Sequence, residues 1–132
     1  MASFLIGLEI IGWDANSHTV TFQLYWSAQA RVREDFTSFL HLIGPFNQAT
    51  GGIFWCGADA MPGGGAYPTS AWRLGETIIE PRSLVVPQGL ATGDYYLEIG
   101  WYILATGERL HLTGPAMAGD RLLLGPQHIE AE

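Results

Sequence analysis

The side chains best suited to chemistry are four histidines, one cysteine and thirteen carboxylates. No histidine lies at ligand spacing from another histidine or from Cys56, so the sequence predicts no structural zinc site. The alternating acidic residues of a calcium loop are missing around Asp59, although one calcium bound by Asp59 and backbone carbonyls stays open. There is no Gly-x-Ser-x-Gly motif, and no lysine of a phosphate-binding loop follows the glycines at 63–65. We therefore expect no enzyme, no cofactor and no metal.

His41 admits two interpretations. It is expected in the middle of a strand, on the same face as Phe39 and Ile43. A lone histidine among apolar neighbours is most often a neutral, hydrogen-bonded residue of the core. The alternative is a polar anchor beneath a ligand-binding loop.

Aromatic side chains are the strongest indication of a binding function, because the chain has five Trp and five Tyr. Sugar-binding sandwiches expose aromatic faces on which a pyranose ring can stack, but large aromatics more often fill cores. We expect Trp26 and Trp101 in the core. Trp72 and Tyr67 are better placed for exposure, although a tryptophan that attaches its loop to the sheet is the commoner case. The candidate ligand-binding residues are Trp72, Tyr67, Asp59 and His41.

The elements that must position these residues are strands, because the hydrophobic pattern has a period of two. The clearest case is Thr19 to Trp26, where apolar and polar residues alternate. About eight strands are expected, over residues 4–11, 19–26, 35–43, 52–59, 76–86, 94–104, 109–113 and 121–129. No repeat or linker interrupts them. This pattern predicts an all-β fold, a single jelly-roll-like antiparallel β-sandwich domain over residues 1–132.

Three local features refine this expectation. Residues 60–75 form the longest irregular stretch, where consecutive glycines and two prolines disfavour a regular element. Pro81 suits an edge strand or a bulge rather than a central strand. Gly100 would allow a bulge that turns Tyr102 to the face of Tyr95.

Composition excludes several partners. The net charge is -7 and the chain has no lysine, which argues against nucleic acid and against an acidic membrane surface. One cysteine excludes an internal disulfide, and we expect Cys56 to be a small buried hydrophobe. The N-terminal stretch has no positive region, so no signal peptide is predicted, and no apolar run is long enough for direct membrane insertion.

Several phrases of the sequence carry a family resemblance when they occur in this order. They are Leu24-Tyr25-Trp26, Asp35-Phe36 with Phe39-Leu40-His41-Leu42, Pro68-Thr69-Ser70-Ala71-Trp72-Arg73-Leu74-Gly75-Glu76, Gly93-Asp94-Tyr95-Tyr96-Leu97-Glu98-Ile99-Gly100-Trp101-Tyr102, and Thr106-Gly107-Glu108-Arg109-Leu110. Over roughly residues 5–128 the chain resembles the soluble C-terminal domain that follows the membrane helices in many bacterial dolichyl-phosphate-mannose-type (mannosyltransferase-like) glycosyltransferases.

The resemblance implies a β-sandwich outside the cytoplasm that accompanies a membrane sugar transferase, whose catalytic residues lie in the membrane part. We therefore expect a non-catalytic accessory domain that binds glycan or presents substrate, with a glycan or a membrane glycosyltransferase as partner. The alternative is a structural or protein-interaction β-sandwich without a small-molecule ligand. A homo-oligomer stays open. The chain is expected to be either an excised domain or a stand-alone relative of such domains.

Overall fold

The computed structural model describes residues 4–112 and 119–131, which form strands and two short 3-10 turns. The strands are β1 (Phe4–Asp14), β2 (Thr19–Ala28), β3 (Thr37–Asn47), β4 (Gly52–Gly57), β5 (Thr77–Val85), β6 (Gly93–Tyr102) and β7 (Leu122–Ile129). The turns are η1 (Pro62–Gly65) and η2 (Thr69–Ala71), both between β4 and β5.

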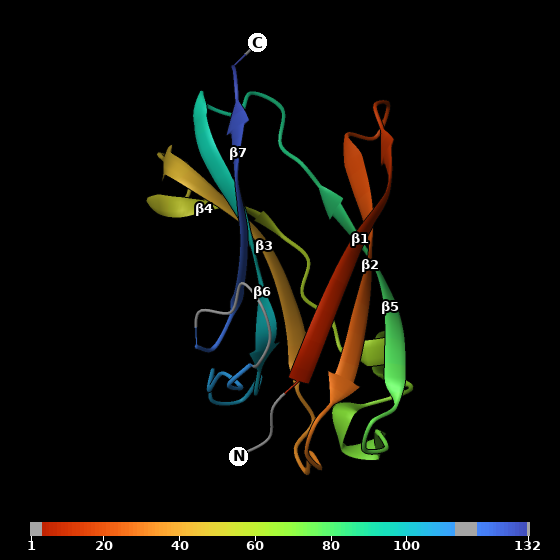
Figure 1. The fold of residues 1–132 in the computed structure, drawn as a ribbon. Helices are drawn as coiled ribbons and strands as arrows, with labels where there is room; N and C mark the ends of the chain where they lie inside the picture. Colours follow the sequence, from red (N-terminus) through yellow and green to blue (C-terminus); the bar gives the residue numbers. More distant parts are fainter. Residues whose placement is uncertain (1–3, 113–118, 132) are drawn as a thin grey trace.

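The strands form two antiparallel sheets that face each other (Figure 1). One sheet has the order β1-β2-β5 and the other the order β4-β3-β6-β7. The predicted β-sandwich is therefore confirmed. The described residues form seven strands rather than about eight, and their three-plus-four order is not that of an eight-stranded jelly roll.

The strand expected over residues 109–113 accounts for the difference in number. Arg109 forms only an isolated bridge with Tyr102, and the Leu110 amide donates to the Trp101 carbonyl at 2.9 Å. Thr113, the last residue of that expected strand, lies outside the described residues. The described part of the segment therefore runs back along the end of β6 without forming a regular strand.

A tyrosine near the start of β6 holds the loop that connects β5 in one sheet to β6 in the other. The Tyr95 hydroxyl donates to the Ala91 carbonyl at 2.7 Å, four residues upstream. This contact is the tyrosine corner found where immunoglobulin-type sandwiches cross between sheets. It fixes the chain where β6 joins the four-stranded sheet.

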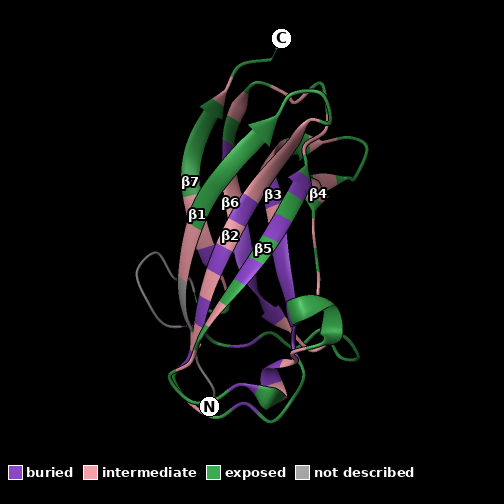
Figure 2. Cartoon of the chain, turned by 90° about the vertical axis from the view of Figure 1, so that its right-hand side faces the viewer, coloured by how far each residue is buried: buried purple, intermediate pink, exposed green. Residues whose placement is uncertain are grey.

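The core lies between the sheets, where the inward residues of each strand meet. On β2, Phe22, Leu24 and Trp26 are buried and alternate with less buried residues, as Figure 2 shows by colour. Trp26 and Trp101 cross from opposite sheets with ring centroids 4.6 Å apart in an edge-to-face arrangement. The prediction that these two tryptophans fill the core is confirmed.

One ion pair is buried in this apolar layer. Glu80 and Arg82 face inward from β5 and are 5% and 7% exposed, with Arg82 Nη2 2.8 Å from Glu80 Oε1. Pro81 lies between them, and β5 is an edge strand, as its proline predicted. Arg82 also reaches across to the other layer, donating to the Ala58 carbonyl at 2.6 Å. The pair thus links the two sheets directly beside the segment that carries Asp59.

Replacing Arg82 by Met should lower the free energy of unfolding by about 3–5 kcal/mol, because it leaves the Glu80 carboxylate buried without a counter-charge. Urea denaturation measures the change. The exposed Arg73, replaced in the same way, is the control and should change stability by less than about 0.5 kcal/mol. The double variant E80M/R82M should regain part of the loss. A loss below 1 kcal/mol in the single variant would contradict this account.

Candidate functional site

His41 and Asp59 come together on the outer face of the four-stranded sheet. His41 lies on β3, and Asp59 follows β4 in an extended segment that continues to pair with β3 through Ala58 and Ala60. The His41 Nε2 atom is 3.1 Å from Asp59 Oδ1. These two of the four predicted residues therefore form one cluster, although 18 positions separate them along the chain.

The His41 ring lies between two carboxylates. Its Nδ1 atom is 3.3 Å from Glu98 Oε1, and its Nε2 atom contacts Asp59. Only a doubly protonated imidazole can donate to both acceptors. Burial alone would lower the pKa of His41, but the Glu98 hydrogen bond and the nearby Asp59 charge outweigh it and raise this pKa.

The interpretation of His41 as a core histidine is therefore wrong in its position. His41 shares its face with Phe39 and Ile43 as expected, but this face points away from the space between the sheets. The ring is half-buried and its environment favours the charged form. A polar anchor next to the long loop describes its position better.

Glu98 on β6 is the most strongly paired carboxylate of the cluster. It pairs with His41 in register, contacts Arg121 Nη1, and lies 3.9 Å from Arg109 Nη1. The His41 hydrogen bond is the largest cause that lowers the pKa of Glu98, and with the two arginines it brings this pKa to about 2 despite burial. Glu98 is therefore a permanent anion at neutral pH.

Two glycines make room for the rings of this face. A Cβ on Gly57 would lie 2.8 Å from His41 Cδ2, and a Cβ on Gly100 would lie 2.6 Å from the Phe39 ring. Because Gly100 lets Phe39 lie flat over β6, the Arg109 guanidinium can cover that ring, 4.5 Å from its centroid. This cation–π contact holds Arg109 beside Glu98.

Tyr102 also belongs to the cluster, and the sequence analysis placed it on the wrong face. Its hydroxyl donates to Asp59 Oδ2 at 3.0 Å. The pairing of β6 with β3 runs without a shift past Gly100, so no bulge turns Tyr102 inward with Tyr95. Regular alternation of side chains along the strand, counted from Glu98, would have placed Tyr102 on the correct face.

Trp72 and Tyr67 do not form an exposed aromatic surface. Trp72 is 5% exposed, packs edge-to-face on Trp101 with centroids 5.6 Å apart, and donates from Nε1 to the Tyr67 carbonyl. The Tyr67 hydroxyl donates to Glu76 Oε1 at 2.6 Å. Trp72 thus attaches the loop to the core, which was the commoner of the two expectations for it.

The rest of the Pro-Thr-Ser-x-Trp phrase has the same role. The Thr69 hydroxyl is fully buried, donates to the Glu34 carbonyl at 2.7 Å and accepts from the Phe36 amide. Ser70 bonds to the Asp35 carboxylate. These contacts hold residues 60–75 against the start of β3, so the phrase describes a fixed loop rather than an open binding loop.

The Glu98 carboxyl of the cluster is not suited to donating a proton near neutral pH, because its pKa is lowered. A carboxyl group that acts as a general acid near neutral pH needs a raised pKa. Burial raises the pKa of Glu80, but this residue lies in the core with Arg82. Burial also raises the pKa of the Cys56 thiol to about 11, which keeps it protonated. The arrangement on the outer face is suited to holding a polar ligand.

Two further properties apply to residues 4–112 and 119–131. Within these ranges, no three His, Cys, Asp or Glu side chains gather in a way that could hold a metal ion. Within the same ranges there is also no helix of the length and apolar character that crossing a membrane requires.

The face that surrounds the cluster is partly open to solvent. The side chains of Asp59, Arg109 and Arg121 are 36%, 35% and 34% exposed. The Phe54 ring on β4 lies edge-to-face with His41 and is 39% exposed. An exposed aromatic ring thus lies next to His41, on the same sheet face as the carboxylate and guanidinium groups, and we call this face the polar face.

Comparisons with protein-family models, with curated proteins and with solved structures each found no match. The geometry of the polar face and the sequence resemblance are therefore what a functional proposal can be built on.

Replacing Glu98 by Gln and replacing Asp59 by Asn should each lower the pKa of His41, because each carboxylate raises this pKa through a hydrogen bond and through its charge. NMR titration of the histidine ring protons measures both shifts. The His128 ring is an internal control, because its pKa is raised by other carboxylates, Asp94 and Glu130. An unchanged His41 titration in both variants would contradict the assignment.

The same contacts predict how stability depends on pH. A raised folded pKa means that the contribution of His41 is fully present below about pH 6.5 and is lost as the pH rises through the folded value. The lowered pKa of Glu98 means that its contribution is present above about pH 4.5 and is lost as the pH falls toward 2. Urea denaturation of the wild type and H41Q across pH 5–9 should show a difference that shrinks at high pH. A constant difference would argue against a charged His41.

Proposed function

We propose that this chain is a non-catalytic accessory domain of an extracytoplasmic glycosyltransferase system, and that it binds glycan on the polar face. The observation that carries the proposal is the convergence of Asp59, Tyr102 and Arg109 with the exposed Phe54 ring on one sheet face. The membrane transferase as partner and the location outside the cytoplasm rest on the sequence resemblance.

The chemistry of the polar face supports a sugar ligand. Sugar hydroxyls both donate and accept hydrogen bonds, and charged partners make these bonds stronger. Asp59 offers carboxylate oxygens, while Arg109 and Arg121 offer guanidinium donors, each with about a third of its side chain exposed. Phe54 offers an apolar ring for the carbon face of a pyranose.

The charge states favour binding over catalysis. Glu98 is held as an anion by His41 and both arginines, so it cannot protonate a leaving group. His41 is held between two carboxylates, which favours its charged form and makes it a poor general base. The cluster is thus a fixed set of charges with a partly open surface.

A glycan array with mannose-, glucose- and galactose-terminated oligosaccharides, followed by calorimetric titration of the best ligand, tests the proposal. Asp59→Ala and Phe54→Ala should each weaken binding at least tenfold, because one removes an exposed acceptor and the other the stacking ring. Circular dichroism should show an unchanged fold, since neither side chain is part of the buried core.

Asp94→Ala is the matched control, because this exposed carboxylate pairs with His128 at the start of β6, four positions from Glu98 along the strand. It should bind as the wild type does. Absence of binding to every sugar tested would sink the glycan proposal and favour the structural or protein-interaction alternative. Equal loss in all three variants would place the ligand elsewhere.

A further inference from the structure

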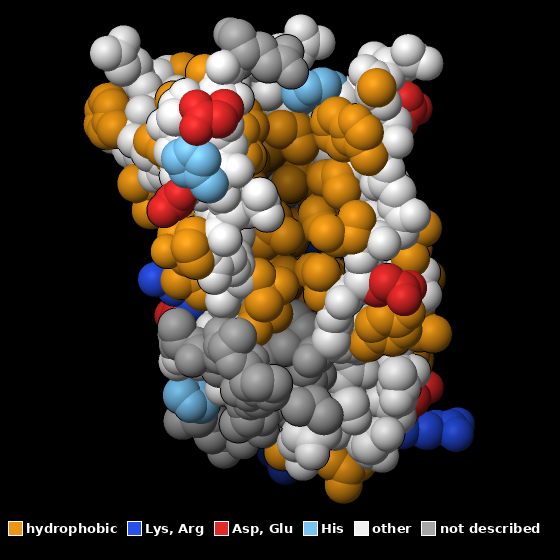
Figure 3. Space-filling view, turned by 45° about the horizontal axis from the view of Figure 1, so that its top comes forward, with side chains coloured by type: hydrophobic (Ala, Val, Ile, Leu, Met, Phe, Trp, Pro, Cys, Tyr) orange, Lys and Arg blue, Asp and Glu red, His pale blue; other side chains and the backbone are white. Residues whose placement is uncertain are grey.

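The two sheets separate at one side of the sandwich and leave an apolar cleft between β1 and β7. Its volume is about 440 Å³. Figure 3 shows hydrophobic side chains gathered in a hollow between two ridges of backbone. The cleft lies between the sheets, so it is distinct from the polar face.

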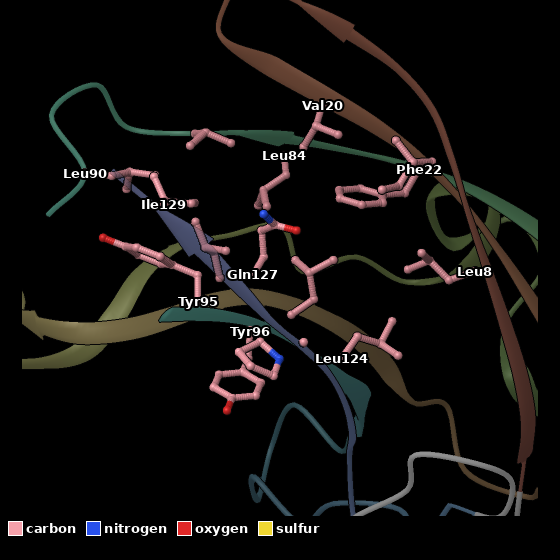
Figure 4. Close-up of a pocket in the computed structure, with 16 residues that line it drawn as sticks. Leu8, Val20, Phe22, Leu84, Leu90, Tyr95, Tyr96, Leu124, Gln127 and Ile129 are labelled. Carbon is pink, nitrogen blue, oxygen red and sulfur yellow. The ribbon is translucent and has the colours of Figure 1, made fainter. Parts of the chain in front are cut away.

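The floor of the cleft is the buried core itself. Phe22 and Leu84 come from the three-stranded sheet and Tyr95 from the other, and all three are at most 2% exposed. Leu8 on β1 and Leu124 on β7 line the two walls, as Figure 4 shows. A solvent-accessible cavity of this size lined almost wholly by apolar groups is the usual form of a small-molecule site.

The shape of the cleft suits an extended chain. Its lining runs along β7 from Leu124 to Ile129, and five residues of strand span roughly 15 Å. A volume of 440 Å³ over that length corresponds to a cross-section of about 30 Å². A single hydrocarbon chain fits these proportions.

Both strands that border the cleft carry features that disfavour an added strand. The pairing of β1 with β2 shifts between Ile10 and Gly12, which is a bulge. On β7, Pro126 lacks a backbone N–H, and the pairing with β6 is interrupted at the same level. Bulges and edge prolines are the usual means by which sheet edges avoid pairing with another chain. A ligand that uses only side-chain contacts is therefore favoured over a peptide strand.

The charges around the cleft disfavour an anionic head group. None of the described residues that line it is Lys or Arg, and Gln127 is its one amide side chain. Next to Gln127, His128 lies between the carboxylates of Asp94 and Glu130 at 2.9 Å each, which leaves the rim acidic. A free carboxylate or phosphate would meet like charge there.

From these observations we infer that the cleft binds a single acyl-type or isoprenoid-type hydrocarbon chain with an uncharged end. The chain lies along β7 over the Phe22 and Leu84 side chains, and its polar end meets the Gln127 amide. This site does not depend on the glycan proposal, because none of the residues that line the cleft belongs to the cluster on the polar face.

Displacement of the uncharged fluorescent dye N-phenyl-1-naphthylamine tests the inference. The dye should bind saturably, and 1-dodecanol should displace it at concentrations at least tenfold lower than 1-hexanol, since each added methylene in an apolar site gains up to about fourfold. Dodecanoate should displace it less well than dodecanol, because of the acidic rim. Asp59→Ala should leave dye binding unchanged.

Two variants fill the cleft from different elements. Leu8→Trp acts from β1 and Leu90→Trp from the loop before β6, and each should weaken dye binding at least tenfold. Ile79→Trp is the control, because Ile79 is 55% exposed on β5 outside the cleft. Thermal denaturation identifies any variant that fails to fold. Leu90→Trp changes a loop residue, so it does not alter a strand.

The inference would be overturned by absence of saturable dye binding, by unchanged binding in both Leu8→Trp and Leu90→Trp, or by equal displacement by hexanol and dodecanol. Displacement by a peptide of residues 4–14 but not by dodecanol would also overturn it, because the cleft would then accept a strand.

Discussion

The buried ion pair of Glu80 with Arg82 constrains the arrangement of both sheets. Charges in an apolar layer are costly unless each is paired and hydrogen-bonded, so the guanidinium has little freedom in where it points. Arg82 forms an ion pair with Glu80 on its own strand and donates to the Ala58 carbonyl of the opposite layer. Because Asp59 is the residue after Ala58, this ion pair inside the sandwich helps to fix the position of Asp59 on the outer surface.

The side chains that fill the interior change from ionic to apolar along β5. The change occurs at Leu84, the next inward-facing residue after Arg82. Up to Arg82 the space between the sheets is filled by Trp26, Trp101 and the ionic side chains. From Leu84 onward the sheets diverge and the apolar cleft opens. The molecule therefore offers two surfaces of opposite chemistry, a charged one on the outer face of one sheet and an apolar one between the sheets. Each follows from which side chains fill the layer at that level.

Much of the fold could be predicted from the period-two pattern, because burial of one strand face imposes that pattern directly on the sequence. It placed β2 within two residues and Trp26 and Trp101 in the core, whereas Pro81 indicated an edge strand or a bulge for β5. Where a strand is apolar on both faces, as β3 is, the pattern cannot tell inside from outside. His41 was for this reason assigned to the core. Tyr102 was misplaced because a glycine was interpreted as a bulge when its role is to accommodate the Phe39 ring.

The sequence by itself determined the fold class and the core position of Trp26 and Trp101, because these depend on local alternation and the size of side chains. Only the tertiary structure decided that His41, Asp59 and Glu98 meet, since they come from three segments whose pairing is a property of sheet order and register. It alone revealed the cleft as well. A cavity is the space between distant strands, and the sequence pattern of each strand is the same whether or not the sheets close over it.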